Sequence, residues 1–151
     1  MEYKHTQIGY VFIFVLVWML GVTALIVVFA EDEAAEALLV MAISTVIVLL
    51  VVFWFSRLTV RVSGSEVRVG FGPGWPRRVF GSYEIVGFRA VRNKWYFGWG
   101  VRKIPDGWMY NVWGLDAVEL ELASGKKFRI GTNEPDELIA ALSSHLALRP
   151  G

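Results

Sequence analysis

Two groups of residues in this sequence are of types that catalyse reactions in other proteins. Ser144 and His145 could act as a nucleophile and a general base, and Glu119 and Glu121 could act as paired carboxylates. Ser144 and His145 are neighbours on one turn of a predicted helix, a position that does not give the geometry of a catalytic triad. The two glutamates alternate along a predicted strand opposite two basic residues, which indicates solvated ion pairs between strands. We therefore expect a protein that is not an enzyme.

The glycine-rich segments do not complete a cofactor-binding motif. Gly98 and Gly100 would begin a dinucleotide fingerprint, but that fingerprint needs a third glycine where Lys103 stands. Gly125 precedes two lysines, without the upstream glycine and the Ser or Thr of a phosphate-binding loop. The chain has no cysteine and its two histidines are near opposite ends, which is a poor basis for a zinc site. We expect no cofactor and no metal.

Two uncharged apolar runs, 8–30 and 37–55, occupy the first third of the chain. At ~1.5 Å per residue, each run can cross a hydrocarbon core of ~30 Å as a helix. A cleaved signal peptide is the alternative for the first run, but the run is longer than the usual core of ~7–15 apolar residues. We therefore expect a transmembrane helical hairpin over residues 1–56 that makes the protein integral to a lipid bilayer.

The charges that flank the two runs predict the orientation of the hairpin. The connecting loop, residues 31–36, has four acidic residues and no base, whereas Lys4 precedes the first run and Arg57 and Arg61 follow the second. Lys and Arg in short flanking segments stay on the cytoplasmic side of the membrane. We expect a multi-pass protein with both termini in the cytoplasm.

Residues 57–151 have the pattern of a cytoplasmic domain of strands followed by one helix. Apolar and polar residues alternate with a period of two between glycine-containing turns. A helix then begins near Thr132 or Asn133, with Pro135 and three acidic residues in its first turn. The predicted strands are 58–63, 66–71, 78–80, 85–91, 108–112, 117–122 and 127–130. We expect about six or seven antiparallel strands closed by a C-terminal helix.

Several motifs in this domain resemble those of a known family. They are WYFGWGVR at 95–102, PDGW at 105–108, YNV at 110–112, GLDAVE at 114–119 and GKKFRIGT at 125–132. Over most of residues 57–147, the chain is similar to small prokaryotic membrane proteins with two transmembrane helices and a bacterial pleckstrin-homology-like (PH-like) domain. Trp113 departs from the family, in which a small polar residue is typical. The resemblance implies a mostly-β PH-like fold in the cytoplasmic (inner) membrane of a prokaryote, and no known activity.

The positive charge of the domain is concentrated in its first half. Residues 57–103 contain ten Lys or Arg and two Glu, with several aromatic residues in glycine-rich turns. Bases mixed with interfacial aromatic residues suit an anionic membrane surface. The residues predicted to form a membrane or partner surface are Trp75, Arg77, Arg78, Trp95, Tyr96, Trp99, Arg102 and Lys103.

Three interpretations of these residues stay open at the level of sequence. The aromatic residues could fill the core, the surface could bind a protein partner or a second copy of the chain, or it could recognise anionic lipid headgroups. Nucleic acid is not expected, because the domain has a net charge of only +5 and is held at a membrane. The expected function is a membrane-anchored, non-catalytic PH-like interaction module, an adaptor or assembly component, with recognition of anionic lipid as the alternative.

Overall fold

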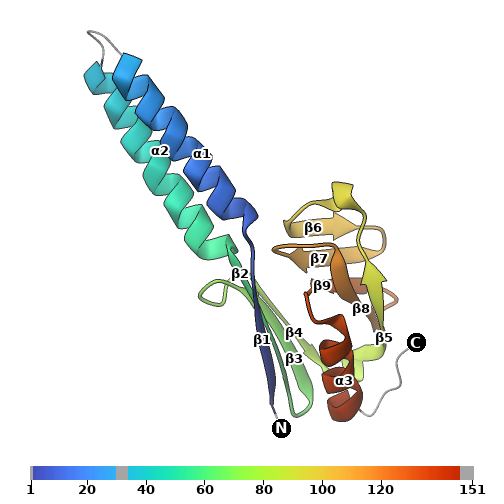
Figure 1. Cartoon of the computed structure of the whole chain (residues 1–151). Helices are drawn as coiled ribbons and strands as arrows, with labels where there is room; N and C mark the ends of the chain where they lie inside the picture. The colour runs from blue at the N-terminus through green and yellow to red at the C-terminus, as the bar shows by residue number, and fades with distance from the viewer. Residues whose placement is uncertain (1, 30–33, 147–151) are drawn as a thin grey trace.

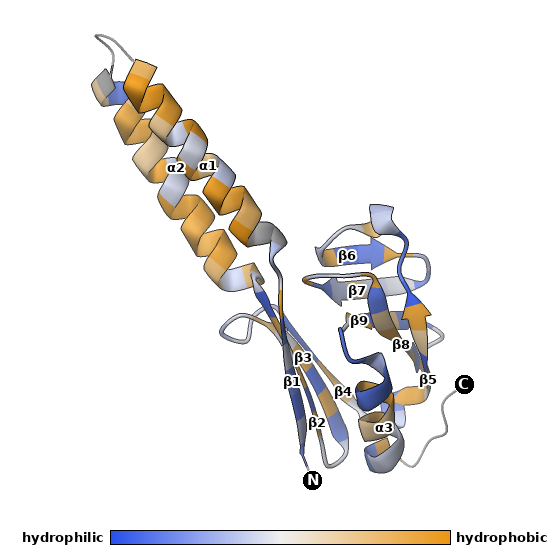
Figure 2. Ribbon diagram, viewed as in Figure 1, coloured by the Kyte–Doolittle hydropathy of each residue, from blue (hydrophilic) through white to orange (hydrophobic). Residues whose placement is uncertain are grey.

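The computed structural model describes residues 2–29 and 34–146, and it consists of a pair of helices projecting from a β-rich domain (Figure 1). Three of the four acidic residues in the loop that carries the predicted orientation, at positions 31–33, lie outside the described residues. The helices are almost uniformly apolar, and the domain mixes polar and apolar residues along each strand (Figure 2). The two parts thus bury their apolar surface in different ways.

The two helices, α1 (Val11–Phe29) and α2 (Ala34–Phe55), lie side by side and antiparallel (Figure 1). Residues Ala35–Phe55 are long and apolar enough to cross a membrane by length and composition, and the protein buries none of that segment. Helix α1 is also apolar along its length, and its 19 residues make it shorter than α2. The first helix was expected to begin at residue 8, but it begins at residue 11 because the preceding segment is a strand.

Strand β1 (Tyr3–Ile8) pairs antiparallel with β2 (Arg57–Ser63), from Tyr3 opposite Val62 to Ile8 opposite Arg57. The amide of Gly9 extends this ladder by donating to the carbonyl of Ser56, with an N···O distance of 2.7 Å. An antiparallel pair of helices brings its two flanking segments side by side, which is the arrangement that strand pairing requires. The structure therefore moves the expected boundary at residues 56 and 57, since the first strand of the domain precedes both helices.

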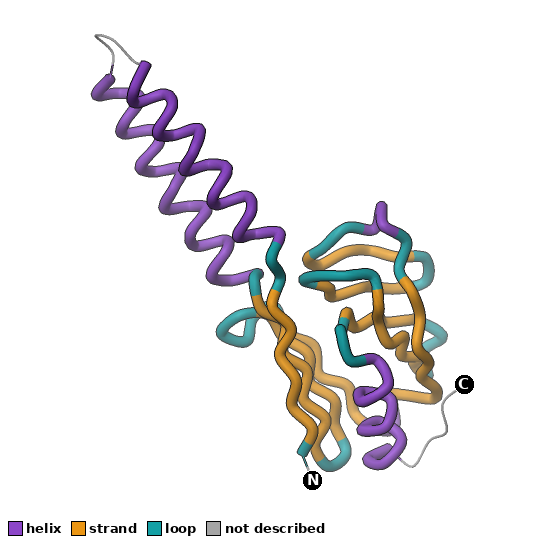
Figure 3. Tube along the Cα trace, viewed as in Figure 1, coloured by secondary structure: helices purple, strands orange, loops and turns teal. Residues whose placement is uncertain are grey.

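The domain contains two sheets and a C-terminal helix, α3 (Pro135–Leu146) (Figure 3). The first sheet has the order β1-β2-β3-β4, with β3 at Glu66–Phe71 and β4 at Arg77–Gly81. The second has the order β5-β8-β9-β7-β6. Its strands are β5 (Ile85–Arg92), β6 (Gly100–Ile104), β7 (Gly107–Asn111), β8 (Asp116–Leu122) and β9 (Lys127–Gly131).

The described residues form nine strands, more than the six or seven expected, and β7 runs parallel to β9. The two additional strands are β1 and β6. Strand β6 has only five residues, including a glycine and two adjacent bases, so its alternating pattern is weak. The parallel pair requires a close approach of backbones, because a side chain at Gly107 would overlap the backbone of Lys127.

The core lies between the two sheets and α3. Apolar residues of β2 and β3, such as Leu58 and Phe71, pack with those of β5, β8 and β9 and with Leu138 and Leu142 of α3. The hydroxyl of Thr132 accepts a hydrogen bond from the amide of Glu134 at 3.0 Å in the turn before α3. The carbonyl of Glu134 accepts the first bond of the helix from Leu138, so the helix starts one or two residues after the expected cap at Thr132 or Asn133. Two N-terminal helices, a β-rich domain and a closing helix are thus all present.

The β1–β2 ladder predicts that the domain needs residues 2–9 for its full stability. In a chain in which Asn-Gly replaces residues 10–55, a two-residue turn would join Gly9 to Ser56 across their hydrogen bond. We expect this chain to unfold in one thermal transition at a higher temperature than residues 57–146 alone. A gain of about 5 °C or more corresponds to roughly 1 kcal/mol for a domain of this size. Equal melting temperatures would show that β1 contributes nothing to the domain.

Candidate functional site

The turn between β3 and β4 places Trp75 beside the end of α2. Its side chain is 67% exposed, and its carbonyl accepts a hydrogen bond from Nε1 of Trp54 in the last turn of α2. In the same turn the amide of Gly72 donates to the carbonyl of Arg57 at 2.9 Å. Gly72 has a φ of 45°, and a side chain there would overlap the backbone of Trp54. Trp75 is therefore uncovered at the level where α2 leaves the domain.

A short 3₁₀ helix, η2 (Trp95–Phe97), lies over the outer face of the second sheet. The ring of Phe97 covers Arg129 of β9, with 5.9 Å between the ring centroid and Cζ. Trp95 is 79% exposed and Tyr96 is also exposed, with their two rings edge to face at 6.0 Å. Phe97 thus holds the segment on the sheet and leaves the other two rings uncovered.

Three aromatic rings connect the following loop to the start of α1. Trp99 stacks on Trp113, with centroids 5.9 Å apart and 15° between the planes. Tyr10, directly before α1, meets Trp113 edge to face, also at 5.9 Å. The carbonyl of Trp113 accepts a hydrogen bond from Nε2 of Gln7 on β1 at 3.1 Å. Trp113, the position that departs from the resembled family, therefore packs between the domain and the helices.

Aromatic side chains from separate segments of the chain thus gather around the base of the helical pair. The β3–β4 turn and η2 both lie at the end of the domain from which the helices project (Figure 1). Tyr and Trp are the residues that concentrate at the interface of a membrane with water. We call this set the aromatic collar, and it consists of Tyr10, Trp54, Trp75, Trp95, Tyr96, Trp99 and Trp113.

The four predicted bases are divided between opposite faces of their strands, and of the four only Arg102 is hydrogen-bonded to a collar residue among the described residues. Arg77 lies on the outer face of the first sheet, and Arg78 points to the opposite side of β4. Arg102 of β6 donates from Nε to the carbonyl of Trp99 at 2.9 Å, whereas Lys103 points to the other side of that strand. All four bases are exposed. Side chains alternate between the two faces of a strand, so consecutive bases lie on opposite faces. A prediction based on composition alone places them on one surface.

Glu119 of β8 holds together the strands that support η2. Its carboxylate is 0% exposed and accepts hydrogen bonds from Nη2 of Arg89 and Nε of Arg129, each at 2.7 Å, with Nζ of Lys127 at 3.6 Å. Burial raises the pKa of Glu119, but the hydrogen bonds from the two arginines outweigh it and hold the pKa below its ordinary value. The expectation of a solvated ion pair at this residue is wrong, because the Glu119 side chain is completely buried beneath the three basic side chains that contact it.

Sequence reasoning missed the basic outer face of the first sheet, where Arg57, Arg61 and Arg68 lie on the same face as Arg77. The signal was present in β2, in which Arg57, Thr59 and Arg61 alternate and must share one face. The sequence pattern did not predict β1, which adds Lys4 and Thr6 to that face. This strand forms only by pairing with β2, from which the two helices separate it in the sequence.

Ser144 and His145 contact each other and the backbone of their own helix, with 3.1 Å between Oγ of Ser144 and Nδ1 of His145. Ser144 donates its hydroxyl proton to the carbonyl of Ala141 at 2.9 Å, and Nδ1 of His145 lies 2.8 Å from the same carbonyl. Within residues 2–29 and 34–146, no three His, Asp or Glu side chains are grouped to hold a metal ion.

Comparison with models of known protein families gives no match to this chain, and comparison with curated proteins gives none either.

Glu119→Gln should destabilise the protein by about 3 kcal/mol, because it removes the charge from a buried group held by three bases. The stabilisation by ionised Glu119 is complete above the ordinary carboxylate pKa and is lost as the pH falls through its lowered folded-state pKa. Thermal unfolding of the full chain in neutral detergent should show a lower melting temperature for this variant at pH 7 and a smaller loss on acidification. Glu121→Gln, on the same strand, is the matched control, and equal effects of the two changes would contradict the assignment.

Proposed function

We propose that this protein is a membrane-anchored, non-catalytic interaction module with a PH-like domain. In this proposal, α1 and α2 both cross the cytoplasmic membrane of a prokaryote and both termini lie in the cytoplasm. At ~1.5 Å per residue, the 19 residues of α1 and the 22 residues of α2 extend for about 28 and 33 Å, close to the thickness of a hydrocarbon core. Lys4 and Arg57, on the domain side of the helices, support this orientation.

The observation that carries the proposal is the direct continuation of the β1–β2 ladder into both helices. Residue 9 is hydrogen-bonded to residue 56, and α1 and α2 begin and end within two residues of that bond. The ring of Phe55 at the end of α2 packs on Phe71 in the core, with centroids 5.5 Å apart. A domain attached in this way has no flexible linker, so it would be held against the bilayer surface in one orientation.

The surface that this attachment turns toward the bilayer is the aromatic collar. Trp75 on one side of the helices and Trp95 on the other are the most exposed of its tryptophans. Amphipathic rings at the headgroup level are stabilised by contact with both the polar and the apolar parts of lipid. Nearby bases such as Arg57 and Arg102 would add attraction to anionic lipids of about 1 kcal/mol each. The geometry therefore favours contact with an anionic membrane surface as the role of this end of the domain.

Headgroup-level fluorescence quenching tests this role in the full chain. In nanodiscs that contain a lipid with a nitroxide on its headgroup, we expect Trp75→Phe and Trp95→Phe each to reduce the fraction of tryptophan emission that is quenched. Trp108→Phe is the matched control, because Trp108 is also exposed but lies at the opposite end of β7 from the collar. If Trp108→Phe lowers the quenched fraction and neither Trp75→Phe nor Trp95→Phe does, the collar faces away from lipid.

A second candidate function, binding of a protein partner or a second copy, is favoured by a different surface. Tyr83 in η1 (Ser82–Glu84) is 84% exposed, and Val86 of the edge strand β5 is exposed beside it. The segment formed by η1 and the start of β5 lies at the end of the domain away from the helices (Figure 1). Exposed apolar side chains next to an unpaired strand edge suit association through added strands.

The absence of cysteine from the chain makes self-association simple to test. If copies associate through this edge, Tyr83→Cys in native membranes should form an intermolecular disulfide on mild oxidation. Lys126→Cys, in the exposed turn between β8 and β9, should not. Equal cross-linking at the two positions, or none at position 83, would exclude self-association through η1 and β5.

A further inference from the structure

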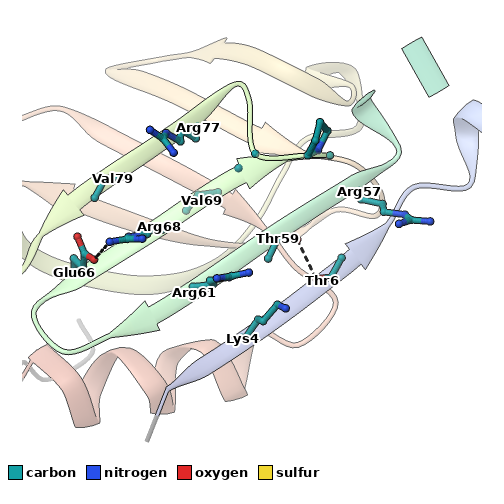
Figure 4. A pocket seen from close by; sticks show the side chains of 14 residues that line it. Lys4, Thr6, Arg57, Thr59, Arg61, Glu66, Arg68, Val69, Arg77 and Val79 are labelled. Atoms are coloured by element: carbon teal, nitrogen blue, oxygen red, sulfur yellow. Dashed lines mark hydrogen bonds and ion pairs between the residues drawn. The ribbon is translucent and has the colours of Figure 1, made fainter. Parts of the chain in front are cut away.

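The outer face of the first sheet carries a shallow groove of about 630 Å³ that is rich in bases (Figure 4). Strands β1 to β4 all contribute to it, together with the β3–β4 turn. The basic residues that line it are Lys4, Arg57, Arg61, Arg68 and Arg77. The only acidic residue in the lining is Glu66, which forms an ion pair with Arg68. Glu2 lies near the far end of the groove.

The strand register concentrates these bases at an energetic cost. Arg61 lies opposite Lys4 of β1 on one side and opposite Arg68 of β3 on the other. Like charges directly opposite each other destabilise a sheet. Among the described residues, no carboxylate lies within ion-pair distance of Lys4, Arg61 or Arg77. A bound anion would relieve this repulsion.

The floor of the groove provides neutral hydrogen-bonding groups between the bases. Next to the Lys4–Arg61–Arg68 row, Thr6 lies opposite Thr59, and their Oγ1 atoms are 2.9 Å apart. The position beyond Thr59 is Gly70, where the absence of a side chain leaves the floor open toward Arg77. Guanidinium groups and hydroxyls around a hollow are the donors that a phosphate group accepts from proteins.

The groove runs away from the base of the helices. Arg57 is the first residue of β2, directly after the end of α2, and Arg61 is four residues further, about 13 Å along the strand. One end is therefore beside the level at which the helices leave the domain, and the other is open to solvent.

We propose that this groove is a binding site for a phosphate-bearing anion. The Thr6 and Thr59 hydroxyls and the Arg61 and Arg77 guanidinium groups would hold the phosphate. Two sources share this chemistry: the headgroup of an anionic phospholipid, which would enter at the Arg57 end, and a soluble phosphate compound, which would enter at the solvent end. None of the collar rings lines the site, and the proposal does not require them to touch lipid.

Isothermal titration of the full chain in neutral detergent tests the site. The anionic probes are inorganic phosphate and dihexanoyl phosphatidylglycerol, and the control is dihexanoyl phosphatidylcholine, a zwitterionic lipid with no net charge. We expect saturable binding of at least one anionic probe. Arg61→Gln should weaken it about tenfold or more, as expected for loss of a charge-assisted hydrogen bond. Thr59→Val, which leaves the charge unchanged, should also weaken it. Arg92→Gln removes the same charge from an exposed position on the second sheet and should leave the affinity unchanged.

The relative affinities for the two anionic probes identify the source of the phosphate. Tighter binding of phosphatidylglycerol indicates a lipid headgroup, and tighter binding of inorganic phosphate indicates a soluble ligand. No saturable binding of either probe would overturn the proposal, as would equal losses for Arg61→Gln and Arg92→Gln. Stronger binding of a poly-glutamate peptide than of both probes would assign the groove to an acidic protein segment instead. A melting temperature measured for each variant shows that a loss of binding is not a loss of folding.

Discussion

The hydrogen-bonded ladder between β1 and β2 determines how the helical pair meets the domain. Each strand runs directly into a helix, and the Gly9–Ser56 bond closes the ladder at the point where the helices begin. One sheet therefore fixes the spacing of the helices, and the helices in turn bring the N-terminal segment to the edge of that sheet. Strand β1 itself depends on β2, because a single strand of six residues has no partner for its backbone hydrogen bonds without it.

The attachment of the domain to the helices explains why the collar rings are exposed. The collar rings surround the only end of the domain that lies beside the helices, and they are fixed there by backbone contacts such as those of Trp75 and Trp113 with Trp54 and Gln7. On the second sheet the buried Glu119 holds the strands on which η2 rests. Exposed aromatic residues on a rigid support have less conformational entropy to lose when they meet a surface.

Much of the fold could be predicted from the sequence, because periodicity reports which face of an element is buried. The strands β2, β3, β8 and β9 follow the alternation closely, and α3 begins at Pro135, which the sequence places in the first turn of the helix. The pairing of β1 could not be predicted, since a ladder that connects residues on either side of two helices leaves no local signal. The predicted surface, which was based on composition, placed Arg77 and Arg78 together, but they lie on opposite faces of β4 because side chains alternate along a strand. Lys4 joins the basic groove only through the pairing of β1.

Hydrogen exchange of the full chain in nanodiscs tests the central claim most directly. If the domain is fixed to the helices through the β1–β2 ladder, the alternate amides of residues 3–9 that face β2 should exchange as slowly as the amides of residues 57–63, because β1 is an edge strand and only those amides donate to β2. Exchange of residues 3–9 within seconds, with residues 57–63 still protected by β3, would show that the N-terminal segment is an unpaired flank and would contradict the account.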